Sequence, residues 1–234
     1  MADMARGLGR ALQTALAQEG PGEDLDVEGP SLANARRRQL FRYLCLRPCA
    51  RVGEMGRILA MSHATVRWHE RDLLAKHYIE LDGTRAFPRG LIDPEDSHLF
   101  TLLATPGRSS VLMACYTDPG ISLLDLADVV GLTRQSASKI TSELADLGLV
   151  ALVEDGRFRR HYPTDVLARK RETNLPRAHA FAEGFVRRLG EEGLSPEVLR
   201  SESGVVIVRF GSGARHVVLD LHVDPYVTAW KSKP

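Results

Sequence analysis

The chain has 234 residues, of which 44% are hydrophobic and 26% are charged, and its 31 Lys and Arg against 30 Asp and Glu give a formal net charge of +1. This balance excludes a strongly basic protein that coats nucleic acid, although basic residues gathered on one face can still contact phosphates. No apolar run approaches the roughly 18 residues that span a bilayer, and the first 20 residues lack the apolar segment of a secretory signal. We therefore expect a cytoplasmic protein without a membrane partner.

Residues 1–30 are expected to form an N-terminal helix and a linker. Leu8, Leu12 and Leu16 recur at four-residue spacing within residues 3–18, which is typical of a short amphipathic helix. The sequence GPGEDLDVEGPS that follows is rich in Gly, Pro and acidic residues, as linkers are.

The next stretch, residues 31–92, is predicted to form a first domain with the plan of a winged helix. Ser62 stands where an N-cap hydroxyl belongs, directly before the third helix, which is expected to bury Leu74. Asp82-Gly83 is typical of a tight turn between two strands. The expected elements are helices over 32–46, 53–60 and 63–76 and a strand over 78–81.

Residues 97–163 are predicted to form a second domain that repeats the plan of the first. Without a gap, Pro48 aligns with Pro119 and Ser62 with Thr133. The helix before the turn is expected to direct Val129 into the core. The expected elements are helices over 97–103, 108–116, 123–130 and 134–147 and strands over 150–153 and 157–162.

The outer face of the helix over 133–147 is the strongest candidate for reading DNA. In a helix-turn-helix, the second helix enters the major groove. Arg suits guanine and Gln suits adenine, while Ser and Lys suit phosphate. No acid precedes Glu143 on this helix, whereas a merely solvated face more often mixes charges of both signs. The candidate residues are Thr133, Arg134, Gln135, Ser138, Lys139 and Ser142.

The predicted wing, residues 153–162, contributes further cations. Alternation along a strand places Arg157, Arg159 and His161 on one face. Phe158 and Arg160 share the other face, and Phe158 is expected to point inward. Arginines near a hairpin tip suit the DNA backbone or the minor groove, although a solvated edge strand carrying charge would look similar.

The first domain offers a weaker set of DNA-binding candidates. Its third helix also carries two acids, Glu70 and Asp72, and its wing is short. Trp68 is expected to be exposed, which favours a protein contact, and His69 to be buried. The candidate DNA-binding residues are His63, Arg67, Arg71 and Arg85.

Residues 164–234 are expected to form a C-terminal region of helix and β-hairpin that supports dimerisation. Two helical pieces are predicted on either side of Pro176. Two alternating apolar runs, 205–210 and 216–223, flank Gly211-Ser212-Gly213 and predict a hairpin.

We find no pattern typical of a catalytic, metal or cofactor site. The chain has three cysteines, an odd number that argues against a disulfide framework. Cys45 and Cys49 leave open a ligand- or redox-responsive switch, but two thiolates alone do not complete a zinc site. Small buried apolar side chains are the favoured interpretation.

The stretch 108–163 resembles the winged-helix domains of ArsR- and MarR-type transcriptional regulators. The LADLGLV segment after a Ser-rich helix and the Gly156-Arg157 wing carry this resemblance. The first domain is similar in plan but weaker in detail, and the tandem arrangement resembles regulators found in archaea. The resemblance implies a DNA-binding regulator that is not an enzyme. The cysteine metal motif of the sensing members is absent from the matching helix, and residues 164–234 resemble no family.

We therefore expect an α+β, mainly α fold, with two tandem winged-helix domains plus a C-terminal helix and β-hairpin unit. The leading hypothesis is a transcriptional regulator that binds double-stranded DNA as a homodimer and needs no cofactor. The alternative is a tandem winged-helix scaffold that binds proteins in a transcription or chromosome-organising complex, which the near-zero net charge and Trp68 favour.

Overall fold

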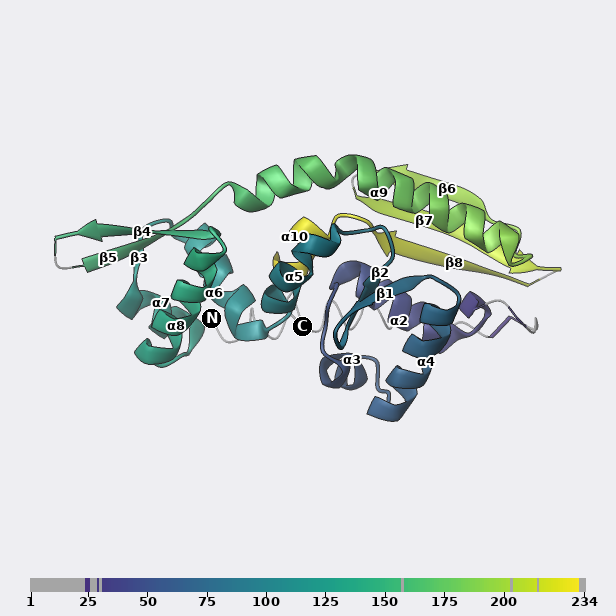
Figure 1. Ribbon diagram of the computed structural model, residues 1–234, viewed down its shortest axis with the longest axis horizontal. Helices are drawn as coiled ribbons and strands as arrows, with labels where there is room; N and C mark the ends of the chain where they lie inside the picture. Colours follow the sequence, from purple (N-terminus) through teal and green to yellow (C-terminus); the bar gives the residue numbers. More distant parts are fainter. Residues whose placement is uncertain are drawn as a thin grey trace.

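The computed structural model describes residues 24–25, 29, 31–156, 158–202, 204–213 and 215–231. The helix expected over 3–18 and most of the expected linker lie outside the described residues. The described chain is mainly helical with small antiparallel sheets, so the expected α+β, mainly α class is confirmed. Figure 1 shows an elongated molecule in which α9 runs along one long side.

The first unit consists of three helices followed by a hairpin. Asn34 caps its first helix by accepting a hydrogen bond from the Arg37 amide, and Ser62 caps the third by accepting one from the Thr65 amide. Leu74 is 36% exposed, because the adjacent Leu73 occupies the inner face of the last turn, and the expectation that Leu74 is buried was wrong. The elements are η1 (Ser31–Ala33), α2 (Ala35–Leu46), α3 (Val52–Ile58), α4 (His63–Ala75), β1 (Ile79–Asp82) and β2 (Arg85–Pro88).

The second unit has the same order with an additional helix at its start, a longer hairpin and one added strand. Gly131 ends α7 at φ 68°, a left-handed conformation that glycine adopts at low cost. Val129 is 63% exposed, since the neighbouring Leu126 and Ala127 supply the buried side of this short helix, so its predicted burial was wrong. The elements are η2 (Pro94–Asp96), α5 (Ser97–Leu103), α6 (Pro106–Thr117), β3 (Ile121–Ser122), α7 (Leu123–Val130), α8 (Arg134–Asp146), β4 (Val150–Asp155) and β5 (Phe158–Pro163), with strand order β3-β5-β4.

One long helix, α9 (Val166–Glu191), replaces the two helical pieces predicted around Pro176. The helix continues through Pro176 because its apolar face is anchored on both sides, with Leu167 buried before the proline and Phe181 and Phe185 buried after it. The C-terminal hairpin is confirmed, and the sequence did not predict the strand and the helix on either side of it. These elements are β6 (Glu197–Glu202), β7 (Val205–Ser212), β8 (Arg215–His222) and α10 (Pro225–Lys231), with strand order β6-β7-β8.

A single hydrophobic core extends through both units and the C-terminal elements. Phe41 of α2 stacks on Phe185 of α9 with ring centroids 5.5 Å apart. Trp230 of α10 stacks on Tyr116 of α6 at 4.6 Å. The C-terminal elements therefore pack against both units, and Figure 1 shows α10 between them beside α5.

Candidate nucleic-acid interface

Local sequence positions α8 at the surface of the second unit. Gly131 turns the chain after α7, and the Thr133 hydroxyl then accepts a hydrogen bond from the Ser136 amide at 3.2 Å, which caps the first turn of α8. Ala137 and Leu144 are fully buried on the inner face of this helix. This packing determines which side of α8 faces solvent.

The outer face of α8 carries the predicted set of polar side chains together. Arg134, Gln135, Ser138, Lys139 and Ser142 are all exposed and line one open, shallow depression. Two cations and the partial positive charge of the helix N-terminus favour an anionic partner at the start of α8, whereas two acids, Glu143 and Asp146, line the far end of the depression. The side chains also offer donors and acceptors at the spacing of successive helical turns.

The acid that follows this face is already engaged. Glu143 accepts a hydrogen bond from Arg108 of α6 at 2.7 Å, and this bond holds the pKa of the Glu143 carboxyl below its usual value. The pair fastens α8 to α6 and reduces the repulsion that an unpaired carboxylate would exert on a phosphate. Sequence reasoning missed Arg108, because no local pattern links two residues 35 positions apart.

The β4–β5 hairpin projects from the body of the second unit, as Figure 1 shows. Its two described arginines face cross-strand acids: Arg159 pairs with Glu154 at 3.0 Å and Arg160 with Asp155 at 3.1 Å. Arg157 lies outside the described residues. The cations of the wing are therefore partly neutralised, and a phosphate would have to compete with these carboxylates.

The predicted inward facing of Phe158 was wrong. Phe158 is 48% exposed, because the hairpin tip has no core to pack against. His161 lies at the hairpin base, where β3 pairs with β5, and it is buried with Nδ1 2.9 Å from the Ile121 carbonyl oxygen. Alternation alone could not show that the hairpin leaves the body midway along β5.

The candidates of the first unit divide between α4 and the β1–β2 hairpin. His63, Arg67 and Arg71 are exposed on α4, but Arg67 pairs with Glu70 of the same helix at 3.1 Å. Arg85 begins β2, is half-buried and donates from its guanidinium to the Cys49 carbonyl oxygen at 3.5 Å. Three of the four candidates thus share one face of α4, and only Arg85 lies apart from them.

The side chains that flank this set have the expected burial. Trp68 is 55% exposed, with the Arg37 guanidinium 5.2 Å from its ring centroid, and His69 is buried, so both predictions are confirmed. Burial lowers the pKa of His69, and the positive charge of Arg37 lowers it further. Burial raises the pKa of Glu70 despite its pairing with Arg67.

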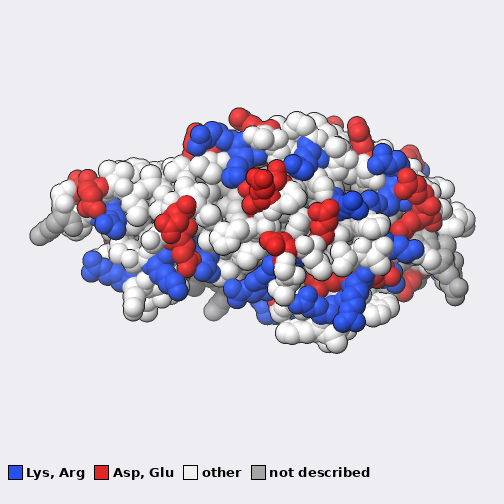
Figure 2. Space-filling model, viewed as in Figure 1, with Lys and Arg blue, Asp and Glu red and all other residues white. Residues whose placement is uncertain are grey.

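Lys and Arg side chains gather along the lower edge of the molecule in Figure 2, over the region of α8 and again over that of α3 and α4. Acidic side chains are more frequent along the upper part of the same face. The two cationic areas thus lie on the same side of the long molecule.

The cysteines do not suit a metal or redox switch. Burial raises the pKa of Cys49 to about 12 and that of Cys115 to about 11, and burial also raises the pKa of Cys45. The thiolate that binds metal or reacts is therefore disfavoured at all three. Within the described residues, no group of three His, Cys, Asp or Glu is arranged to hold a metal ion, and no helix there is long and apolar enough to cross a membrane.

Comparison with known proteins supports a winged helix in the second unit. The MarR family model matches residues 105–161, from the N-cap of α6 to the buried His161 of β5. A crystal structure of the DIP2311 protein from Corynebacterium diphtheriae is 17% identical to this chain, with a TM-score of 0.23. The similar part covers 55% of this chain and 26% of that chain, which is about a quarter of that protein. No curated protein matches the sequence.

Proposed function

We propose that this chain is a DNA-binding transcriptional regulator that reads duplex DNA mainly with its second unit. The observation that carries this proposal is the exposed polar face of α8, from Thr133 to Ser142, on a segment that matches the MarR family model. In this proposal, residues 133–147 enter the major groove and the wing, residues 153–162, contacts the backbone or the minor groove.

The side chains divide between base and backbone contacts. Arg134 and Gln135, in the first turn of α8, suit the edges of guanine and adenine. Ser138, Lys139 and Ser142 suit phosphate oxygens. Arg159 and Arg160 exchange their carboxylate partners for phosphates, which costs little because surface ion pairs contribute only about 0–1 kcal/mol.

The wider organisation is part of the same proposal. Residues 31–92 and 97–163 act as tandem winged-helix domains, and residues 164–234 support a homodimer, so that two copies of α8 meet two half-sites. The protein acts in the cytoplasm without catalysing a reaction.

Binding to random duplex DNA over a salt series tests the proposal. Wild type is expected to lose affinity steeply between about 50 and 200 mM salt, because each neutralised phosphate releases counterions. The variant Arg134→Ala/Arg159→Ala should bind more weakly with a salt slope reduced by about 1 to 2.

A matched control removes the same charge elsewhere. Arg187 and Arg200 are exposed on α9 and β6 and pair with nearby carboxylates. The variant Arg187→Ala/Arg200→Ala should keep the wild-type slope. Equal losses in both double variants, or no duplex affinity of the wild type near 0.1 M salt, would contradict the proposal.

A second candidate function applies to the first unit, which we propose binds a protein. The observation that favours it is Trp68, an exposed aromatic side chain on α4 beside the paired Arg67 and Glu70. Trp68→Ala is expected to leave the affinity for DNA unchanged and to abolish capture of a protein partner. A large loss of DNA affinity would instead place α4 on the duplex.

A further inference from the structure

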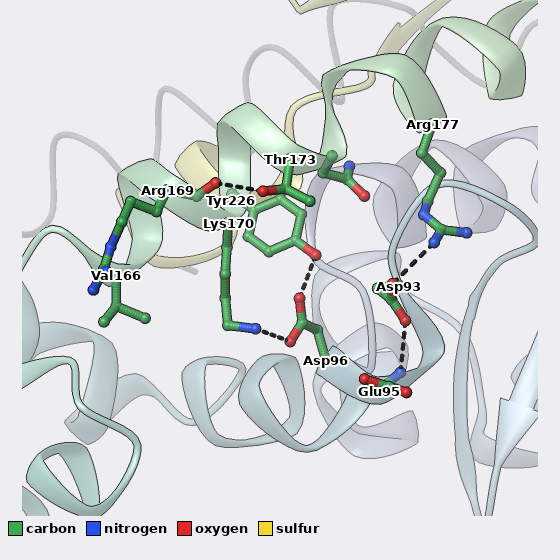
Figure 3. A pocket seen from close by; sticks show the side chains of 10 residues that line it. Asp93, Glu95, Asp96, Val166, Arg169, Lys170, Thr173, Arg177 and Tyr226 are labelled. Atoms are coloured by element: carbon green, nitrogen blue, oxygen red, sulfur yellow. Dashed lines mark hydrogen bonds and ion pairs between the residues drawn. The ribbon is translucent and has the colours of Figure 1, made fainter.

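A polar cavity of about 380 Å³ lies where α9 crosses η2 and α10. Figure 3 shows its walls, with Lys170 reaching from α9 to Asp96 of η2 and Arg177 to Asp93, the N-cap of η2. The volume is within the range of small-molecule sites. The residues of this α9 cavity are Asp93, Glu95, Asp96, Val166, Arg169, Lys170, Thr173, Asn174, Arg177 and Tyr226.

One wall of the α9 cavity is held in place by buried hydrogen bonds. Asp96, only 7% exposed, receives the Lys170 ammonium at 2.6 Å on one oxygen and the Tyr226 hydroxyl at 2.6 Å on the other. Both carboxylate oxygens are therefore occupied and the charge is compensated. This arrangement is preorganised and leaves Asp96 little capacity for a ligand.

A buried acceptor without a partner also lines the cavity. Asn174 is 6% exposed, and its amide nitrogen donates to the Leu91 carbonyl oxygen at 3.0 Å. That bond settles the orientation of the amide, because only its NH2 group can donate to a carbonyl oxygen. The Asn174 Oδ1 atom is left buried with no hydrogen-bond partner, which is costly unless a donor reaches it.

The side chains around the opening of the cavity carry both positive and negative charges. Asp93, Glu95 and Asp96 face Arg169, Lys170 and Arg177, so the lining is formally neutral. Arg177 pairs with Asp93 at 2.9 Å across the rim, and each is 41% exposed, so that both remain accessible. A ligand with a net charge gains nothing overall from such a site, whereas one that carries both charges meets a partner for each.

We propose that the α9 cavity binds a small zwitterion of the free amino acid class. Its ammonium group donates to Asn174 Oδ1 of α9 and faces the carboxylates of Asp93 and Glu95. Its carboxylate lies among the cations of α9, with Arg177 as its bidentate partner. The side chain of the ligand occupies the remaining volume along Val166 and Thr173.

Calorimetry and thermal unfolding of the full chain without DNA, with each of the twenty amino acids at about 10 mM, test this inference. At least one amino acid is expected to bind and to raise Tm, while the corresponding amine and carboxylic acid, each lacking one charged group, do not. Because no DNA is present, the outcome is independent of the proposed function.

Two substitutions on one helix locate the site. Arg177→Gln should weaken binding about tenfold or more, since a hydrogen bond to a charged group is lost. Arg171→Gln is the matched control: Arg171 is 46% exposed and pairs with Asp224, but it borders a different cavity, toward β7, which Asn174 also lines. Its ligand affinity should equal that of wild type.

Asn174→Leu should abolish binding, because it removes the buried acceptor. If this variant does not fold, as judged by circular dichroism, the comparison of Arg177→Gln with Arg171→Gln still shows whether the ligand binds in the α9 cavity. Three outcomes overturn the inference: no amino acid binds at about 10 mM, the two arginine variants lose affinity alike, or a carboxylic acid binds as well as its amino acid.

Discussion

At the scale of single residues, the buried His69 and the half-buried His222 make the stability of this protein depend on pH. Burial lowers the pKa of His69, with a further contribution from the Arg37 charge, and burial also lowers the pKa of His222, against the opposing charge of Asp220. His69 Nδ1 lies buried without a hydrogen-bond partner. The folded protein therefore resists protonation at both positions.

The sign of the effect follows from proton uptake. The unfolded chain binds protons near pH 6.5, before the folded protein does, so the free energy of unfolding is expected to fall as the pH drops from 7.5 through 6.5. Urea denaturation at several pH values measures it. His69→Gln/His222→Gln should show a flatter slope than the exposed pair His98→Gln/His216→Gln, and equal slopes in the two variants would contradict the prediction.

At the scale of elements, local signals and tertiary packing disagree most clearly in α9. Pro176 lacks an amide hydrogen and normally ends or kinks a helix, yet the helix runs from Val166 to Glu191. The stack of Phe181 and Phe185 against Phe41 holds the second half in line with the first. Packing therefore offsets a local cost at Pro176.

That cost is measurable by substitution. Pro176→Ala restores an amide donor at an exposed position of α9 and is expected to raise the free energy of unfolding, by up to about 3 kcal/mol. Urea denaturation checks it, with Glu183→Ala, exposed on the same helix, as a control that should change stability by less than about 0.5 kcal/mol. A less stable Pro176→Ala protein would show that the core requires a bend at this residue.

The elements that the sequence predicted well share a physical basis. The caps at Ser62 and Thr133 were predictable because a cap is a contact between residues three positions apart. β6 was not predictable, since all six of its residues are exposed and leave no alternation of apolar and polar side chains. Its existence depends on pairing with β7, whose apolar pattern is clear.

At the scale of the whole molecule, contacts between distant segments join the two units into one cooperative structure. Arg42 of α2 pairs with Asp220 of β8 at 2.6 Å, and Tyr226 of α10 donates to Asp96 of η2. The apolar core is likewise continuous from the first unit to the second. Neither unit is therefore expected to unfold alone.

The two tryptophans provide separate probes of this cooperativity. Trp68 lies on α4 of the first unit, whereas Trp230 on α10 stacks on Tyr116 of the second. Urea unfolding of Trp68→Phe and Trp230→Phe, followed by fluorescence of the remaining tryptophan and by circular dichroism, should give coincident midpoints for both probes within each variant. Separate transitions would show that the units unfold independently.

The sequence by itself determined the features that depend on near neighbours. These are the fold class, most helices, the turns at Gly131 and Asp82-Gly83, and the polar set on α8, because periodicity and capping act within a few residues. Only the tertiary structure decided the rest. It exposed Phe158, buried His161, kept α9 continuous through Pro176, paired the cations of the wing with acids, and brought η2, α9 and α10 around one cavity. These outcomes depend on segments tens of positions apart in the chain, and a local pattern contains no information about which of them will meet.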